Sequence, residues 1–233
     1  MLSFLAIPLG IAPTLIWLFF YLKKDLHSEP RHMVALTFLG GMAIAPLALF
    51  AESGALEFLK ALAVPIALQD ALVLFVASAL IEEFLKFAVV RFLVIHSRAF
   101  DEPVDGMVYL IIAALGFAAI ENILILGPLL NESVGEALLT GLMRFWGANF
   151  LHALASGVVG YFYMRGVWGR GLLLGTLFHG FFNGAIVLKA GIGFPIIGFL
   201  LGGMAILVSI FLKRLLAQGS YLPLYLWPKQ YHP

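Results

Sequence analysis

Long apolar segments occupy most of this sequence, and they restrict the possible fold more than any other feature. Each is about 20 residues or longer, which as a helix is enough to cross a bilayer. In hydrocarbon every backbone polar group must be paired internally, so such segments form helices or closed barrels. Barrel strands would show alternation over roughly ten residues, whereas these segments are continuously apolar. The chain is also 62% hydrophobic and only 12% charged. The sequence therefore predicts an all-α, polytopic membrane protein.

The number of apolar segments predicts a bundle of about seven transmembrane helices. Their approximate ranges are 2–22, 31–51, 69–95, 104–129, 137–164, 167–188 and 193–216. Between the second and third, residues 52–69 combine Glu57 and Lys60 with regularly spaced apolar residues. That pattern is typical of a short amphipathic helix at the membrane interface.

Basic residues predict the orientation of these spans. They gather after the first, third, fifth and last segments: Lys23, Lys24, Arg31, Arg91, Arg98, Arg165, Arg170, Lys213, Arg214 and Lys229. The opposite side has only Lys60, Arg144 and Lys189. By the positive-inside rule we expect a multi-pass protein of the cell membrane with its N-terminus outside and its C-terminus in the cytoplasm. Arg144, near the outer edge, is expected to extend its charge toward the interface.

The third apolar segment contains three ionisable residues, Glu82, Glu83 and Lys86. Each costs about 2.5–3.5 kcal/mol at the centre of a membrane helix, so a functional role is the first hypothesis for such groups. Lys86 follows the glutamates by four and three residues and can reach either carboxylate on one helix face. One lysine leaves the second carboxylate without a partner, which disfavours a purely structural ion pair.

Three further segments carry carboxylate, imidazole or amide side chains at a similar depth. These residues are Glu121, Asn122, Asn149, His152, His179 and Asn183. Counting 1.5 Å per residue places both histidines near mid-membrane, level with the glutamate pair. A single histidine there would as readily be an interhelical hydrogen-bonding residue. Two histidines on adjacent spans, together with three carboxylates, indicate a functional site.

Charge and ligand type predict a divalent metal at this site. Glu121, His152 and His179 form a set of two histidines and one carboxylate, as in catalytic zinc sites. Glu82 or Glu83 would carry a proton from water to the leaving amine, and neighbouring helix positions do not decide which. The remaining roles would be oxyanion stabilisation by Asn183 and support by Lys86, Asn122 and Asn149. Without a metal, a glutamate and a histidine would activate water directly.

The order of these motifs resembles a known family. The motifs are Glu82-Glu83-x-x-Lys86, Phe117-x-x-x-Glu121-Asn122, His152, His179-x-x-x-Asn183, Asp25-x-x-x-Glu29-Pro30-Arg31 and Glu102-Pro103-Val104-Asp105-Gly106. Together they resemble the PrsW family of intramembrane proteases, relatives of the CAAX prenyl protease and bacteriocin-processing superfamily. The CAAX branch usually has three variable residues and then arginine after its glutamate pair, and later a Phe-x-x-x-His motif. This chain has Lys86 and Glu121 instead, which favours PrsW. The resemblance covers about residues 25–183 and implies cleavage of membrane-anchored proteins, such as anti-sigma factors, near the outer face.

The sequence thus predicts an intramembrane endopeptidase with one divalent metal, zinc being the first expectation. We expect a single membrane domain over residues 1–233, a catalytic core at about 69–188, and the lipid bilayer and a membrane-anchored protein substrate as partners. A proton- or cation-coupled transporter is the alternative, although the internal repeats typical of transporters are not evident. An inactive binding or immunity factor would lack site residues, and none is missing. A net charge of +1 gives no indication of nucleic-acid binding, and Gly198-x-x-x-Gly202 is compatible with a homodimer.

Overall fold

The secondary-structure elements of the described residues are all helical, which confirms the all-α prediction. The computed structural model describes residues 2–23, 28–187 and 193–217. A 3-10 turn covers Ser3–Leu5 and a π-helical segment covers Val73–Ser78. The α-helices in these ranges are α1 (Ala6–Leu22), α2 (Arg31–Ala61), α3 (Ile66–Leu72), α4 (Ala79–Leu93), α5 (Asp105–Glu132), α6 (Val134–Trp146), α7 (Ala148–Met164), α8 (Trp168–Val187) and α9 (Gly193–Leu216). Lys24, Asp25, Lys189 and Lys229, which entered the sequence arguments, lie outside the described residues.

Four helical stretches are long and apolar enough to cross a membrane. They are Ser3–Leu22, Arg31–Ala61, Asp105–Glu132 and Pro195–Leu216. The protein is therefore a membrane protein with several candidate spans. Helices α4 and α7 have 15 and 17 residues, fewer than the 20 or so of an ordinary span. The count of about seven spans stays a prediction.

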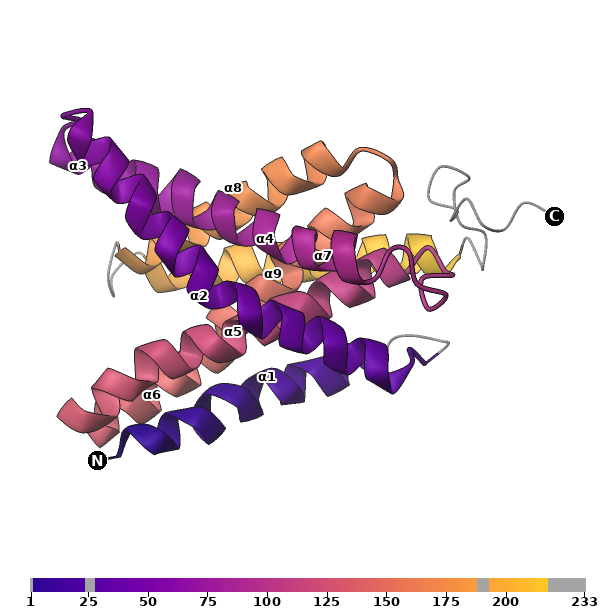
Figure 1. Cartoon of the computed structure of the whole chain (residues 1–233), viewed down its shortest axis with the longest axis horizontal. Coiled ribbons are helices and arrows are strands. Elements are labelled where there is room, and N and C mark those ends of the chain that lie inside the picture. The colour runs from indigo at the N-terminus through magenta and orange to yellow at the C-terminus, as the bar shows by residue number, and fades with distance from the viewer. Residues whose placement is uncertain (1, 24–27, 188–192, 218–233) are drawn as a thin grey trace.

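Helix α5 lies at the centre of the bundle and packs against α1, α2 and α7 (Figure 1). Its N-terminal half is apolar on all sides and almost entirely buried, as expected of a helix enclosed by other helices. Glycines let α2 approach it closely, because Gly41 lies against the Ala113 carbonyl and Gly116 against the Phe38 carbonyl. A Cβ atom at either glycine would collide with backbone, so small residues set this helix contact.

Helix α2 differs from the predicted second segment because it continues without interruption to Ala61. Residues 52–61 are therefore the last turns of a 31-residue helix and not a separate interfacial helix. Polar residues enter at Glu52 and Ser53, yet most of the following residues are good helix formers. A change in polarity along the sequence does not end a helix, and α2 ends only shortly before Pro65.

Two other predicted segments are divided. The third consists of α3, the π-helical segment and α4, and the fifth consists of α6 and α7 on either side of Gly147. Gly147 adopts φ −98° and ψ −85°, outside the helical region, and its lack of a side chain makes that turn inexpensive. Its amide still donates to the Met143 carbonyl at 2.8 Å. The chain thus changes direction there with its backbone paired.

Candidate active site

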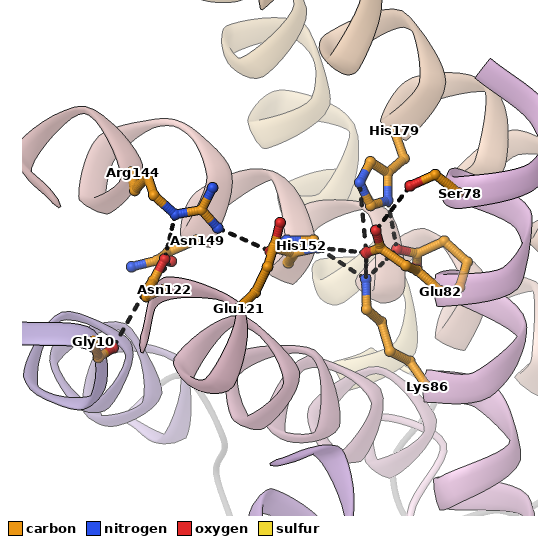
Figure 2. Close-up of polar contacts among 11 residues, drawn as sticks. Gly10, Ser78, Glu82, Lys86, Glu121, Asn122, Arg144, Asn149, His152 and His179 are labelled. Carbon is orange, nitrogen blue, oxygen red and sulfur yellow. Dashed lines mark hydrogen bonds and ion pairs between the residues drawn. The ribbon is translucent and has the colours of Figure 1, made fainter. Parts of the chain in front are cut away.

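Four helices bring the predicted polar residues together in the interior. Figure 2 shows α4 contributing Glu82 and Lys86, α5 contributing Glu121, α7 contributing His152 and α8 contributing His179. Glu83 and Lys86 are completely enclosed, and Glu82, His152 and His179 are at most 5% exposed. The prediction that these helices carry their polar residues to one place is confirmed by this cluster.

Lys86 is the cation at the centre of the cluster. Its Nζ lies 3.1 Å from Glu82 Oε2, 2.9 Å from Glu83 Oε1 and 2.8 Å from His152 Nδ1. An ammonium group has three donors and no acceptor, so all three contacts are donations by Lys86. His152 Nδ1 therefore accepts, and the proton of a neutral His152 ring is on Nε2.

His152 is held on its other side by Glu121. Its Nε2 donates to Glu121 Oε2 at 2.8 Å, while its Nδ1 faces Glu82 Oε2 at 3.8 Å. Phe117 packs beside the imidazole, with a ring-centroid distance of 5.6 Å. The tautomer follows from these hydrogen-bond partners. The lone pair of Nδ1 is thereby directed to the same side as Glu82.

His179 has the corresponding arrangement. Its Nδ1 donates to Glu83 Oε1 at 3.1 Å, and its Nε2 faces Glu82 Oε2 at 3.7 Å. Glu83 is fixed in turn, because Ser156 donates to its Oε2 at 2.7 Å and Lys86 to its Oε1. Each imidazole thus has one nitrogen on a carboxylate and the other directed at Glu82.

Glu82, His152 and His179 form a group that could hold a metal ion, because one ligand atom of each lies within 4.8 Å of the others. Two histidines and one carboxylate are a zinc-type donor set. Carboxylates at the far nitrogens of both histidines are also typical of metal sites, where they fix the ring and its tautomer. The residues present therefore fit a divalent metal.

The carboxylate in this group is Glu82, whereas the sequence analysis proposed Glu121. Glu121 contacts the opposite nitrogen of His152 and also pairs with Arg144, whose Nη2 lies 2.8 Å from its Oε2. The helical periodicity placed Glu121 at the right depth but did not show which side of the imidazole it meets. The geometry favours Glu82 as the ligand and Glu121 as the residue that positions His152.

Arg144 does not extend to the interface as expected, because its charge is used inside the bundle. Besides Glu121, it contacts Asn122, whose Nδ2 donates to Asn149 Oδ1 at 3.0 Å and to the Gly10 carbonyl at 3.2 Å. This chain of contacts, visible in Figure 2, ties α6 and α1 to the site. Asn122 and Asn149 thus contact each other beside the site, and their supporting role stays a prediction.

The structure places Asn183 on α8, one helical turn after His179 and half-buried. Its predicted role as an oxyanion donor stays a prediction. Two residues that the sequence analysis did not select also belong to this region. Ser78, at the end of the π-helical segment, donates to Glu82 Oε1 at 3.2 Å. Glu52, half-buried on α2, is close enough to Glu82 to interact with it electrostatically.

An apolar cavity of about 850 Å³ lies beside the site, between α6, α8 and α9. Its lining includes Arg144, Trp146, Phe182, Ile186, Ile197 and Gly198. Arg144 is the charged member of this lining and is the residue that contacts Glu121. The cavity thus reaches the polar cluster through one side chain.

Comparison with known proteins gives one family. Residues 29–213 match the sequence model of a family described as PrsW family intramembrane metalloprotease. Protease PrsW of Geobacillus kaustophilus is 36% identical over 161 residues, which cover 69% of this chain and 66% of that protein. Protease PrsW of Oceanobacillus iheyensis is 31% identical over 81% of this chain and 85% of its own length. Protease PrsW of Bacillus subtilis is 32% identical over 68% of this chain and 67% of its own length. No solved structure matches the chain.

Proposed function

The chain belongs to the PrsW family of intramembrane metalloproteases, and we propose that it hydrolyses a peptide bond of membrane-anchored proteins at Glu82, His152 and His179. The observation that supports this most is the pairing of both imidazoles with carboxylates at their far nitrogens. One nitrogen of each ring lies on the side of Glu82, inside a bundle with candidate membrane spans. A metal there would take the lone pair of His152 Nδ1 that accepts from Lys86 in this structure. A set of donors directed at one point is what a catalytic metal requires.

The expected metal is one divalent ion, with zinc as the first candidate, held by Glu82, His152 and His179. When bound, such an ion polarises the scissile carbonyl and makes water a nucleophile near neutral pH. Glu121 and Glu83 keep the two rings oriented, and Lys86 balances the negative charge of the glutamate pair. Asn183, one turn beyond His179, would donate a hydrogen bond to the oxyanion.

The surroundings of the site support a proposal for the substrate class. A protease with its polar residues buried among membrane helices acts on a segment that enters from the bilayer. The cavity between α6, α8 and α9 is largely apolar and has Arg144 in its lining. We propose that the membrane segment of a single-span protein occupies it, anti-sigma-factor-like proteins being the first candidates by family resemblance. The transporter alternative has no comparable support, because the family is one of proteases.

The deciding experiment compares His179→Ala with His32→Ala in detergent-purified protein. His32 is exposed at the start of α2, away from the site, and serves as the matched control. We expect one divalent ion per chain, measured by mass spectrometry of the metal, and cleavage of a single-span reporter protein. Both should be lost in His179→Ala and kept in His32→Ala, and a chelator should stop cleavage until zinc is restored.

The opposite results would separate the alternatives. Cleavage without bound metal, insensitive to chelator but lost in Glu82→Gln, would replace the metal by direct activation of water by a glutamate. Absence of cleavage in the wild type, together with ion flux in proteoliposomes, would favour the transporter and contradict the protease proposal.

A further inference from the structure

The two glutamates of the cluster on α4 have both of their carboxylate oxygens engaged by neighbouring side chains. Glu82 accepts from Ser78 and Lys86 on its two oxygens, and Glu83 accepts from Lys86, His179 and Ser156. Glu121 is engaged through one oxygen, Oε2, which contacts both Arg144 and His152. Hydrolysis still needs a group that takes a proton from water and delivers it to the leaving amine.

Glu52 lies beside this cluster on a different helix. Helices α2 and α4 run side by side in opposite directions, since Gly40 lies against Val89 and Leu93, near the end of α4. Further along α2, Ala45 and Ala48 pack with Ile81, Leu85 and Phe117. Glu52 follows Ala48 by one helical turn on the same face, so it lies level with the first turns of α4, where Glu82 is located.

The electrostatic surroundings of Glu52 agree with this placement. Its carboxylate interacts with the charges of Glu82, Glu121, Lys86 and His179, which belong to three different helices. Among the residues that the structure describes, it has no hydrogen bond or ion pair of its own. Glu52 is half-buried, so its carboxylate keeps partial access to solvent.

We propose that Glu52 is a further catalytic residue, the general base that acts on the attacking water and afterwards protonates the leaving amine. This inference rests on the proposed protease function. As the water oxygen bonds to the scissile carbonyl carbon, Glu52 takes a water proton. When the carbon–nitrogen bond breaks, that proton passes to the amine nitrogen and Glu52 is a carboxylate again. One water is consumed, and an acid and an amine are formed.

The test compares Glu52→Gln with Glu57→Gln. Glu57 lies on the same helix, is exposed and pairs with Lys60 at the surface, so its substitution controls for loss of a carboxylate on α2. We expect Glu52→Gln to keep one metal per chain and its thermal unfolding midpoint while kcat falls about 100-fold or more, the range of general acid–base catalysis. Glu57→Gln should stay at the wild-type rate. Added formate should restore part of the activity of Glu52→Ala.

Four results would overturn the inference. A wild-type kcat in Glu52→Gln would exclude the role and leave the protease proposal intact. Loss of metal or of folding in Glu52→Gln would make Glu52 a structural residue and would also leave the protease proposal intact. Glu121→Gln losing kcat while Glu52→Gln does not would assign proton transfer to Glu121. Absence of cleavage in the wild type would overturn the proposed function and this inference together.

Discussion

At the scale of single residues, Lys86 determines how the cluster is assembled. Its ammonium is completely buried and donates to two carboxylates and one imidazole, and it also lies 4.4 Å from the centre of the Phe117 ring. Two adjacent carboxylates without a nearby cation would be costly in a membrane interior. Lys86 therefore makes the glutamate pair tolerable and at the same time fixes the tautomer of His152.

The two carboxylates next to His152 should respond differently to loss of charge. We expect Glu82→Gln to abolish specific zinc binding, because Glu82 faces the directed nitrogens of both histidines. Glu121→Gln should keep one zinc per chain but weaken its affinity about 10- to 100-fold, the usual effect of removing a group that orients a ligand. Competition titration with a chromogenic chelator measures both. Abolished binding in Glu121→Gln with intact binding in Glu82→Gln would restore Glu121 as the ligand.

The residue types of the site could be predicted from the sequence, but their contacts could not. Glu82, Glu83, His152 and His179 stand out because ionisable groups are rare in apolar segments. Which nitrogen meets which carboxylate depends on the rotation and crossing of four helices, and these are set by packing between distant segments. Glu52 escaped notice because it lies at the point where apolar sequence ends, although α2 continues.

At the scale of helices, the breaks in the chain position the site. The π-helical segment directly precedes α4 and places Ser78 against Glu82, in agreement with the frequent occurrence of such segments at functional sites. Gly147 separates α6 from α7, so Arg144 on one helix and His152 on the next both reach Glu121. An apolar run by itself predicts only one long helix, which is why these divisions were not foreseen.

The cavity beside α9 gives a prediction at this scale. A Cβ atom at Gly198 would meet open space, and the same is true of Gly203 on the same helix, but only Gly198 lines the cavity. We expect Gly198→Trp to raise KM for a single-span substrate about tenfold or more by filling the path, with metal content unchanged. Gly203→Trp should behave like the wild type. Equal kinetics of the two variants would show that the substrate segment enters elsewhere.

At the scale of the whole molecule, the helix ends that carry basic residues lie together at one end of the bundle. One end of the bundle holds the ends of α1, α4, α7 and α9 and the beginnings of α2, α5 and α8 (Figure 1). The opposite end holds the N-terminus and the turn from α5 to α6. Of the basic residues that predicted the orientation, those that the structure describes are near the first group of ends: Lys23, Arg31, Arg91, Arg98, Arg165, Arg170, Lys213 and Arg214. The sequence alone could suggest this grouping, since it follows from alternating spans, whereas the central position of α5 could not be foreseen.

This arrangement predicts which end faces the cytoplasm, and the chain is well suited to the test because it contains no cysteine. Gly135 at the start of α6 and Gly169 at the start of α8 are both exposed and lie at opposite ends of the bundle. A membrane-impermeant maleimide should label Gly135→Cys in intact cells, because the end with fewer basic residues is expected outside. Gly169→Cys should be labelled only after the cells are permeabilised. The reverse pattern would place the basic ends outside, against the positive-inside rule, and substrates would then be cleaved from the cytoplasmic side.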